Sequence, residues 1–146
     1  MGNPGVERKP AMPARDGIRW NWLRFMYGYT VVVAGGSGAA IIISPNTVQS
    51  LFRLPNIDPL PFAIIGSVLL AFGLSSLLGL RDPLRFTPIL LLQLGYKIIW
   101  FAGFVLPQSL RGQFPPYGIP LAILFASYVI GDLIAIPFPY LLSKKS

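Results

Sequence analysis

Four long apolar segments limit what this chain can fold into. They cover residues 21–43, 59–80, 86–106 and 120–142, and each has about 21 to 23 residues. At a rise of about 1.5 Å per residue, a helix of that length crosses a hydrocarbon core of roughly 30 Å. Backbone polar groups in lipid must bond within their own segment, so each segment is expected to be a helix. The sequence therefore predicts an all-α integral membrane protein.

The connections between these segments predict how the helices are arranged. They have about 15, 5 and 13 residues, so consecutive helices are expected to run antiparallel in an up-down bundle of four transmembrane helices. This bundle is expected to form one domain over residues 19–146. Residues 1–18 contain three Pro and three Gly with mixed charge and no apolar periodicity, which predicts a disordered basic cytoplasmic arm.

Composition excludes several kinds of chemistry. Hydrophobic residues make up 53% of the chain and charged residues only 12%, whereas a soluble domain carries roughly 25% charged residues. Neither His nor Cys occurs, which argues against disulfides, thiolate nucleophiles, the usual zinc sites and His-ligated haem. We therefore expect no metal site and no cofactor. Although the net charge is +7, the basic residues lie in short connections and form no nucleic-acid-binding pattern, so no nucleic-acid partner is expected.

The basic residues also predict an orientation in the membrane. Nine of them flank one side of the predicted bundle: Arg8, Lys9, Arg15, Arg19, Arg24, Arg81, Arg85, Lys144 and Lys145. The other side carries only Arg53 and Arg111. Because cytoplasmic connections are enriched in Lys and Arg, both termini are expected in the cytoplasm, and a bacterial inner-membrane location is the prediction.

Small residues in the first two segments predict where helices pack. Close backbone approach at such residues is a main source of helix adhesion in lipid. The first segment contains Ala34, Gly35, Gly36, Ser37, Gly38, Ala39 and Ala40, and the second contains Gly66 and Gly73. The pairs Gly35 with Ala39 and Gly36 with Ala40 are four residues apart, so these four residues, with Gly66 and Gly73, are the predicted positions for packing within the molecule or for docking against another subunit. A ligand crevice, for which the missing side chains leave room, is the alternative.

The connection after the first segment contains a short amphipathic stretch. Val48, Leu51, Phe52 and Leu54 lie largely on one face of residues 47–54, and Pro55 ends the stretch. It is too short to span, so we expect it to lie along the membrane interface. A gate over a cavity is the alternative.

One polar and aromatic cluster is expected inside the membrane. Gln93, Tyr96, Lys97 and Trp100 follow one another at spacings of three, one and three residues, which places them on one helix face. Asp132 lies on the fourth segment, with Tyr128 one turn away. Counted from the segment ends, Lys97 and Asp132 both lie about 15 to 17 Å deep, so an ion pair between them is possible.

Three interpretations of this cluster remain open. A single Lys or Asp at the centre of a spanning helix costs roughly 2.5 to 3.5 kcal/mol, so pairing Lys97 with Asp132 offsets a real penalty. The pair can simply specify helix register. It can also form a polar pocket for a small ligand, a quinone head group or a proton, walled by aromatic side chains. A Schiff base on Lys97 is the third reading, although four helices are few to enclose a retinal.

The chain resembles small bacterial DoxX-like membrane proteins over residues 22–142. The resemblance rests on the four-helix arrangement, on Ser44 and Pro45 through Leu54 and Pro55, on the residues Gly79, Leu80 and Arg81, and on the aromatic third segment. It implies a role as a subunit of a membrane oxidoreductase or as a companion of another membrane complex. It carries over no catalytic residue, and the lack of His and Cys argues against a redox role for the chain itself.

The predicted function is that of an accessory or structural subunit. Its expected partners are the lipid bilayer and other membrane protein subunits or its own copies. The alternative is a small transporter or a ligand-binding or quinone-binding membrane protein that uses Lys97 and Asp132, with a hydrophobic small molecule as partner. An enzyme is the third candidate, because Lys97, Asp132, Tyr96 and Tyr128 offer acid and base groups.

Overall fold

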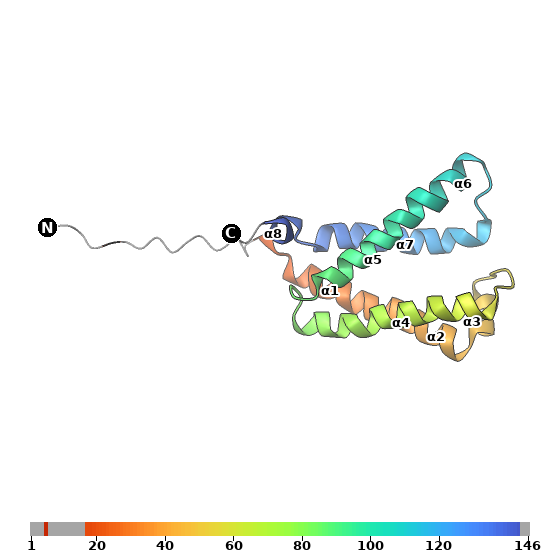
Figure 1. The fold of residues 1–146 in the computed structure, drawn as a ribbon, viewed down its shortest axis with the longest axis horizontal. Helices are drawn as coiled ribbons and strands as arrows, with labels where there is room; N and C mark the ends of the chain where they lie inside the picture. Colours follow the sequence, from red (N-terminus) through yellow and green to blue (C-terminus); the bar gives the residue numbers. More distant parts are fainter. Residues whose placement is uncertain (1–4, 6–16, 144–146) are drawn as a thin grey trace.

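The computed structural model describes Gly5 and residues 17–143. All regular structure in these residues is helical, and four segments are long and apolar enough to cross a membrane: Trp20–Ile43, Pro59–Arg81, Thr87–Leu110 and Pro116–Ala135. Successive segments run in opposite directions (Figure 1). The predicted all-α class with four membrane-length helices is confirmed. Nearly all of the predicted arm, residues 1–18, lies outside the described residues.

The two ends of the bundle differ in what they carry. One end, called here the terminal end, holds the start of the first span, the tight turn after the second span and the C-terminal helix (Figure 1). The other end, called the loop end, holds residues 44–58 and 111–115 between spans. Nine basic residues were predicted on one side of the bundle. Those that the structure describes, namely Arg19, Arg24, Arg81 and Arg85, belong to the terminal end.

Two of the spans contain a π-helical turn. The first span consists of α1 (Trp20–Thr30), the π-helix η2 (Val31–Gly35) and α2 (Gly36–Ile43). The third consists of α5 (Thr87–Trp100), the π-helix η3 (Phe101–Val105) and α6 (Leu106–Leu110). The third span extends past its predicted end at residue 106 to Leu110, and Pro107, which has no N–H to donate, lies in the first turn of α6 directly after the π-helical turn.

Capping chemistry explains how the second span begins. This span is α4 (Pro59–Arg81), and its first turn is capped by Asp58, whose Oδ1 accepts a hydrogen bond from the Leu60 N–H at 2.9 Å. A proline at the first helical position costs no hydrogen bond there. Asp82 has a similar role in the turn before α5, where its Oδ1 accepts from the Arg85 N–H at 3.4 Å.

The fourth span is shorter than the sequence predicted. It consists of the 3₁₀ turn η4 (Pro116–Gly118) and α7 (Ile119–Ala135), and a separate short helix, α8 (Phe138–Leu142), follows. The prediction of one helix over residues 120–142 is wrong at its C-terminal side. Pro137 disfavours helical backbone at the residue before it, and Ile136 is extended with φ −70° and ψ 121°.

Helix α3 (Pro45–Leu51) lies in the connection at the loop end. It ends in a Schellman motif, in which the Leu54 N–H donates to the Gln49 carbonyl at 2.9 Å and the Arg53 N–H donates to the Ser50 carbonyl at 3.2 Å. This motif needs a left-handed residue, and Arg53 adopts it with φ 52°. Glycine is the usual residue at that position, so Arg53 is strained.

Helices α2 and α4 approach one another through glycine. A Cβ added at Gly38 would lie 2.6 Å from the Gly66 carbonyl oxygen and 2.8 Å from the Leu70 Cα, and a Cβ at Gly73 would lie 2.7 Å from the Gly35 nitrogen. The predicted positions Gly35, Gly66 and Gly73 therefore do lie at this contact.

The remaining predicted packing positions on the first span fit less well. Gly36 faces open space, with nothing within 4 Å of an added Cβ, and Ala40 is exposed, whereas Ala39 is half-buried. Gly36 and Ala40 thus take no part in helix packing within the described part of the chain, and their predicted docking against another subunit stays a prediction. The sequence analysis missed Gly38 because seven small residues in a row offer more than one close-packing face, and the partner helix decides which one is used.

Candidate functional site

A buried lysine on α5 lies at the centre of the predicted polar cluster. Lys97 is 1% exposed, and its Nζ lies 4.3 Å from the ring centre of Tyr96, 4.2 Å from that of Tyr128 and 5.3 Å from that of Phe125. Among the described residues, the hydrogen bond of its Nζ is a long one, 3.5 Å to the Gln93 carbonyl oxygen. An ammonium has three N–H donors, so most of the Lys97 donors face aromatic rings and not hydrogen-bond acceptors.

A chain of polar side chains links three helices beside this lysine. The Gln93 Nε2 on α5 donates to Asp132 Oδ2 on α7 at 3.2 Å and to Thr30 Oγ1 on α1 at 3.2 Å. Thr30 in turn donates to the Met26 carbonyl oxygen at 2.8 Å. All three linked side chains are at most 1% exposed. The other carboxylate oxygen, Asp132 Oδ1, is buried without a hydrogen-bond partner in the described part of the chain.

The structure brings Lys97 and Asp132 to one cluster but does not pair them. No ion pair within 4.0 Å joins these two residues, and Gln93 bonds to both of them. A direct ion pair is therefore absent. Gln93 serves both groups by two different parts, since its side-chain amide donates to the Asp132 carboxylate while its backbone carbonyl accepts from Lys97.

The predicted distance of Asp132 from the end of its helix is also wrong. Because α7 ends at Ala135, Asp132 lies only three residues, or about 4.5 Å along the axis, from the terminal end of its helix. Lys97 lies ten residues after Thr87, or about 15 Å from the start of its span, as predicted. The two meet near Gln93 because helical side chains lean toward the N-terminus of their helix, which directs Lys97 toward the terminal end.

The aromatic residues of the predicted site surround the lysine in different ways. The Tyr128 ring packs under Lys97, but its hydroxyl donates to the Tyr29 carbonyl oxygen at 3.5 Å, so it does not join the carboxylate. Tyr96 and Trp100 are half-buried, and the Phe125 ring lies edge-on to both of them at 6.0 and 5.2 Å. Phe125 completes this aromatic wall.

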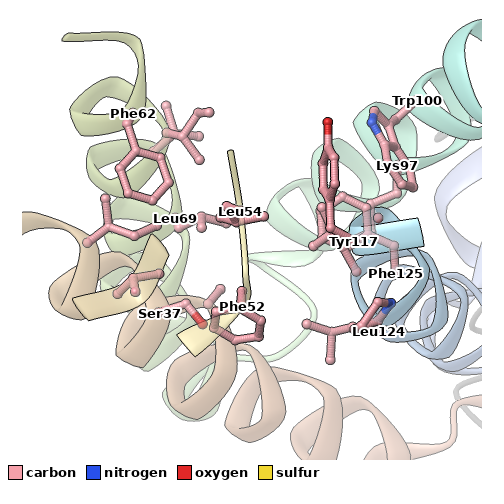
Figure 2. A pocket seen from close by; sticks show the side chains of 18 of the residues that line it. Ser37, Phe52, Leu54, Phe62, Leu69, Lys97, Trp100, Tyr117, Leu124 and Phe125 are labelled. Atoms are coloured by element: carbon pink, nitrogen blue, oxygen red, sulfur yellow. The ribbon is translucent and has the colours of Figure 1, made fainter. Parts of the chain in front are cut away.

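An apolar crevice leads from the loop end down to this lysine. Its volume is about 580 Å³, within the range of small-molecule sites. In Figure 2, Ser37, Phe62 and Leu69 lie on one wall, across from Trp100 and Phe125 near Lys97. The mouth is formed by residues of both connections, namely Val48, Phe52, Leu54, Ile57, Phe114, Pro115 and Tyr117. Toward the loop end, α5 and α6 diverge from α4 (Figure 1). Residues of both α4 and α5 line the crevice.

Sequence reasoning missed two parts of the site. Thr30 was not singled out, although a threonine in an apolar span is a signal of a polar contact between helices. The crevice itself has no sequence signature, because it depends on how far the first two spans lie from the last two spans toward the loop end. Among the described residues, no group of three His, Cys, Asp or Glu side chains could hold a metal ion.

Comparison with known families, with curated proteins and with solved structures finds no match to this chain. The resemblance to DoxX-like proteins therefore stays a prediction. The function must therefore be inferred from the geometry of the crevice and of the polar cluster at its end.

Proposed function

We propose that this chain is a multi-pass membrane protein that binds an elongated hydrophobic molecule in the crevice between α4 and α7. The observation that carries the proposal is the combination of a nearly all-apolar cavity of about 580 Å³ with a single buried cation, Lys97, at its end. Ligand sites are typically apolar cavities with a few polar groups that orient the ligand.

The irregular helices support this proposal. Both π-helical turns contribute to the crevice walls, η2 through Val33 and Ala34 and η3 through Phe104. Such turns weaken a helix and occur mostly at functional sites. A bundle selected only for adhesion has no need for two of them facing the same cavity.

The accessory-subunit prediction stays as the competing proposal. It is supported by the many exposed apolar side chains on the outer faces of the spans, such as Val32, Leu92 and Ile99. Lipid covers such faces equally well, so they do not favour a protein partner. We further propose a bacterial inner-membrane location with the terminal end in the cytoplasm, because most of the basic residues belong to that end.

Fluorescence quenching tests the binding proposal. Trp100 lines the crevice, whereas Trp20 and Trp22 lie at the start of the first span near the terminal end. A hexadecane with two bromine atoms in its chain, added to the detergent-solubilised protein, should quench Trp100 in a saturable way, and unbrominated hexadecane should reverse the effect. The Trp100→Phe variant should lose the saturable component.

Two matched variants locate the binding. Ser37→Phe places a ring into the crevice from α2 and should abolish saturable quenching. Val32→Phe adds a comparable ring one turn earlier on a face that is 73% exposed and outside the crevice, and it should bind like the parent. Quenching that rises linearly with the brominated probe, unchanged by Ser37→Phe, would mean that the crevice takes no ligand and would leave the accessory role as the better proposal.

A further inference from the structure

The cluster at the end of the crevice carries information about the ligand's chemistry. We infer that the ligand ends in an uncharged hydrogen-bond acceptor, such as an ester or ketone carbonyl, which accepts from Lys97. This inference rests on the proposed function, because it names the class of molecule that the crevice takes.

Lys97 has N–H donors that make no hydrogen bond within the described part of the chain. Its Nζ has one long hydrogen bond, to the Gln93 carbonyl oxygen at 3.5 Å, although the residue is 1% exposed and lines the crevice. The rings of Tyr96, Phe125 and Tyr128 that surround the Nζ also line the crevice. Buried N–H donors are costly when unpaired, and an acceptor that enters from the crevice reaches them without displacing a protein partner.

The charges of the cluster favour an uncharged ligand group. Lys97 and Asp132 are one potential cation and one potential anion, connected through Gln93 and both buried. Whether both are charged or both are neutral, the cluster has no net charge. An anionic head group would add an unbalanced charge in an apolar surrounding, which is expensive, whereas a carbonyl adds none.

The cluster also lies away from the ends of the third span. The Lys97 Cα lies about 15 Å along the axis from the start of that span, and its Nζ leans back to the Gln93 carbonyl oxygen, so the amine lies in the apolar part of the span and not at its end. A charged lipid head group stays at the interface, because a charge is costly near the bilayer centre. A molecule with an uncharged polar end can instead place that end beside Lys97 while its chain runs along the apolar walls toward the loop end.

The quenching assay tests this inference with three brominated probes of equal chain length. Methyl palmitate has a neutral carbonyl, hexadecane has no acceptor, and hexadecanesulfonate is permanently anionic. Because one hydrogen bond contributes roughly a factor of ten in affinity, the ester should bind about ten-fold tighter than hexadecane. The sulfonate should bind more weakly than the ester.

Variants of the cluster assign the preference to its charged groups. Lys97→Met should bring the affinities for ester and hexadecane within about two-fold of one another. If that variant does not fold, Lys97→Met combined with Asp132→Leu removes both charges and should show the same loss of preference. Asp132→Asn leaves the lysine without its balancing carboxylate, so it should increase sulfonate affinity at least several-fold relative to the ester.

The outcomes separate this inference from the proposal on which it depends. Saturable binding of all three probes with equal affinity would overturn the inference and leave the binding function intact. Absence of saturable binding by any probe would overturn both. An ester preference that survives in the double variant would overturn the assignment to Lys97, because another group would then donate to the carbonyl. A sulfonate affinity unchanged in Asp132→Asn would overturn the charge-balance argument.

Discussion

Because α2 and α4 are in close contact, adding a single methyl group at Gly38 is expected to destabilise the chain. In the Gly38→Ala variant the new Cβ would lie 2.6 Å from the Gly66 carbonyl oxygen and 2.8 Å from the Leu70 Cα, where ordinary contact begins at 3.4 Å. These neighbours are backbone atoms, which no rotamer change can move aside. The helices must therefore separate by close to an ångström, which also loosens the contact of Gly35 with Gly73. Overpacking of this kind costs about 1–3 kcal/mol, and the rigid neighbours place Gly38→Ala near the upper limit.

Gly36→Ala is the matched control two residues away. Nothing lies within 4 Å of its added Cβ, and alanine is a better helix former, so this variant should equal the parent in stability or gain up to about 1 kcal/mol. Unfolding of both variants can be followed by tryptophan fluorescence in mixed micelles with increasing dodecyl sulfate. A Gly38→Ala variant as stable as the parent, or a Gly36→Ala variant equally destabilised, would refute the assigned packing face.

Three further predictions concern orientation, the polar cluster and the loop end. A Cys at Gln113 should react with an impermeant thiol reagent in intact cells, whereas one at Ser143 should react only after the cytoplasmic side is exposed; the reverse labelling would overturn the orientation. Lys97→Met and Asp132→Leu should each destabilise the chain by about 3–5 kcal/mol and the double variant by much less, as measured by the same unfolding assay; single variants as stable as the parent would mean that water reaches the cluster. Arg53→Gly should stabilise the chain by about 0.5–1 kcal/mol by removing left-handed strain, and a loss of stability would contradict this role.

The sequence was a good guide to the spans and a poor guide to their ends. Length and apolarity predict membrane helices because the bilayer allows few other structures. Pro137, however, ends α7 well before the apolar residues run out, since hydropathy does not detect a missing N–H donor. Because of that one boundary, Asp132 lies three residues from the end of its helix, so the residue count that placed it level with Lys97 does not hold.

The members of the polar cluster were easier to predict than their contacts. Gln93, Lys97 and Asp132 are conspicuous in apolar segments because each costs free energy there. Their pairing depends on the rotation and relative height of α5 and α7, which the spacing of residues within one helix does not define. Where charge complementarity alone suggests an ion pair, Gln93 instead bonds Asp132 through its side-chain amide and Lys97 through its backbone carbonyl.

The glycine contact and the crevice are two consequences of one arrangement. Near the terminal end, α1 packs against both α4 and α7, and the Gln93 link closes the bundle through α1, α5 and α7. Toward the loop end, the first span packs closely against α4 at Gly35 and Gly38. The α7 side chains there, including Leu121 and Leu124, line the crevice. The opposite wall carries Ser37 of α2 together with Phe62 and Leu69 of α4 (Figure 2). Separating α2 from α4 changes the shape of that wall, so the methyl group that weakens the Gly38 contact should also alter ligand binding, which makes close glycine packing a condition for the crevice as well as for stability.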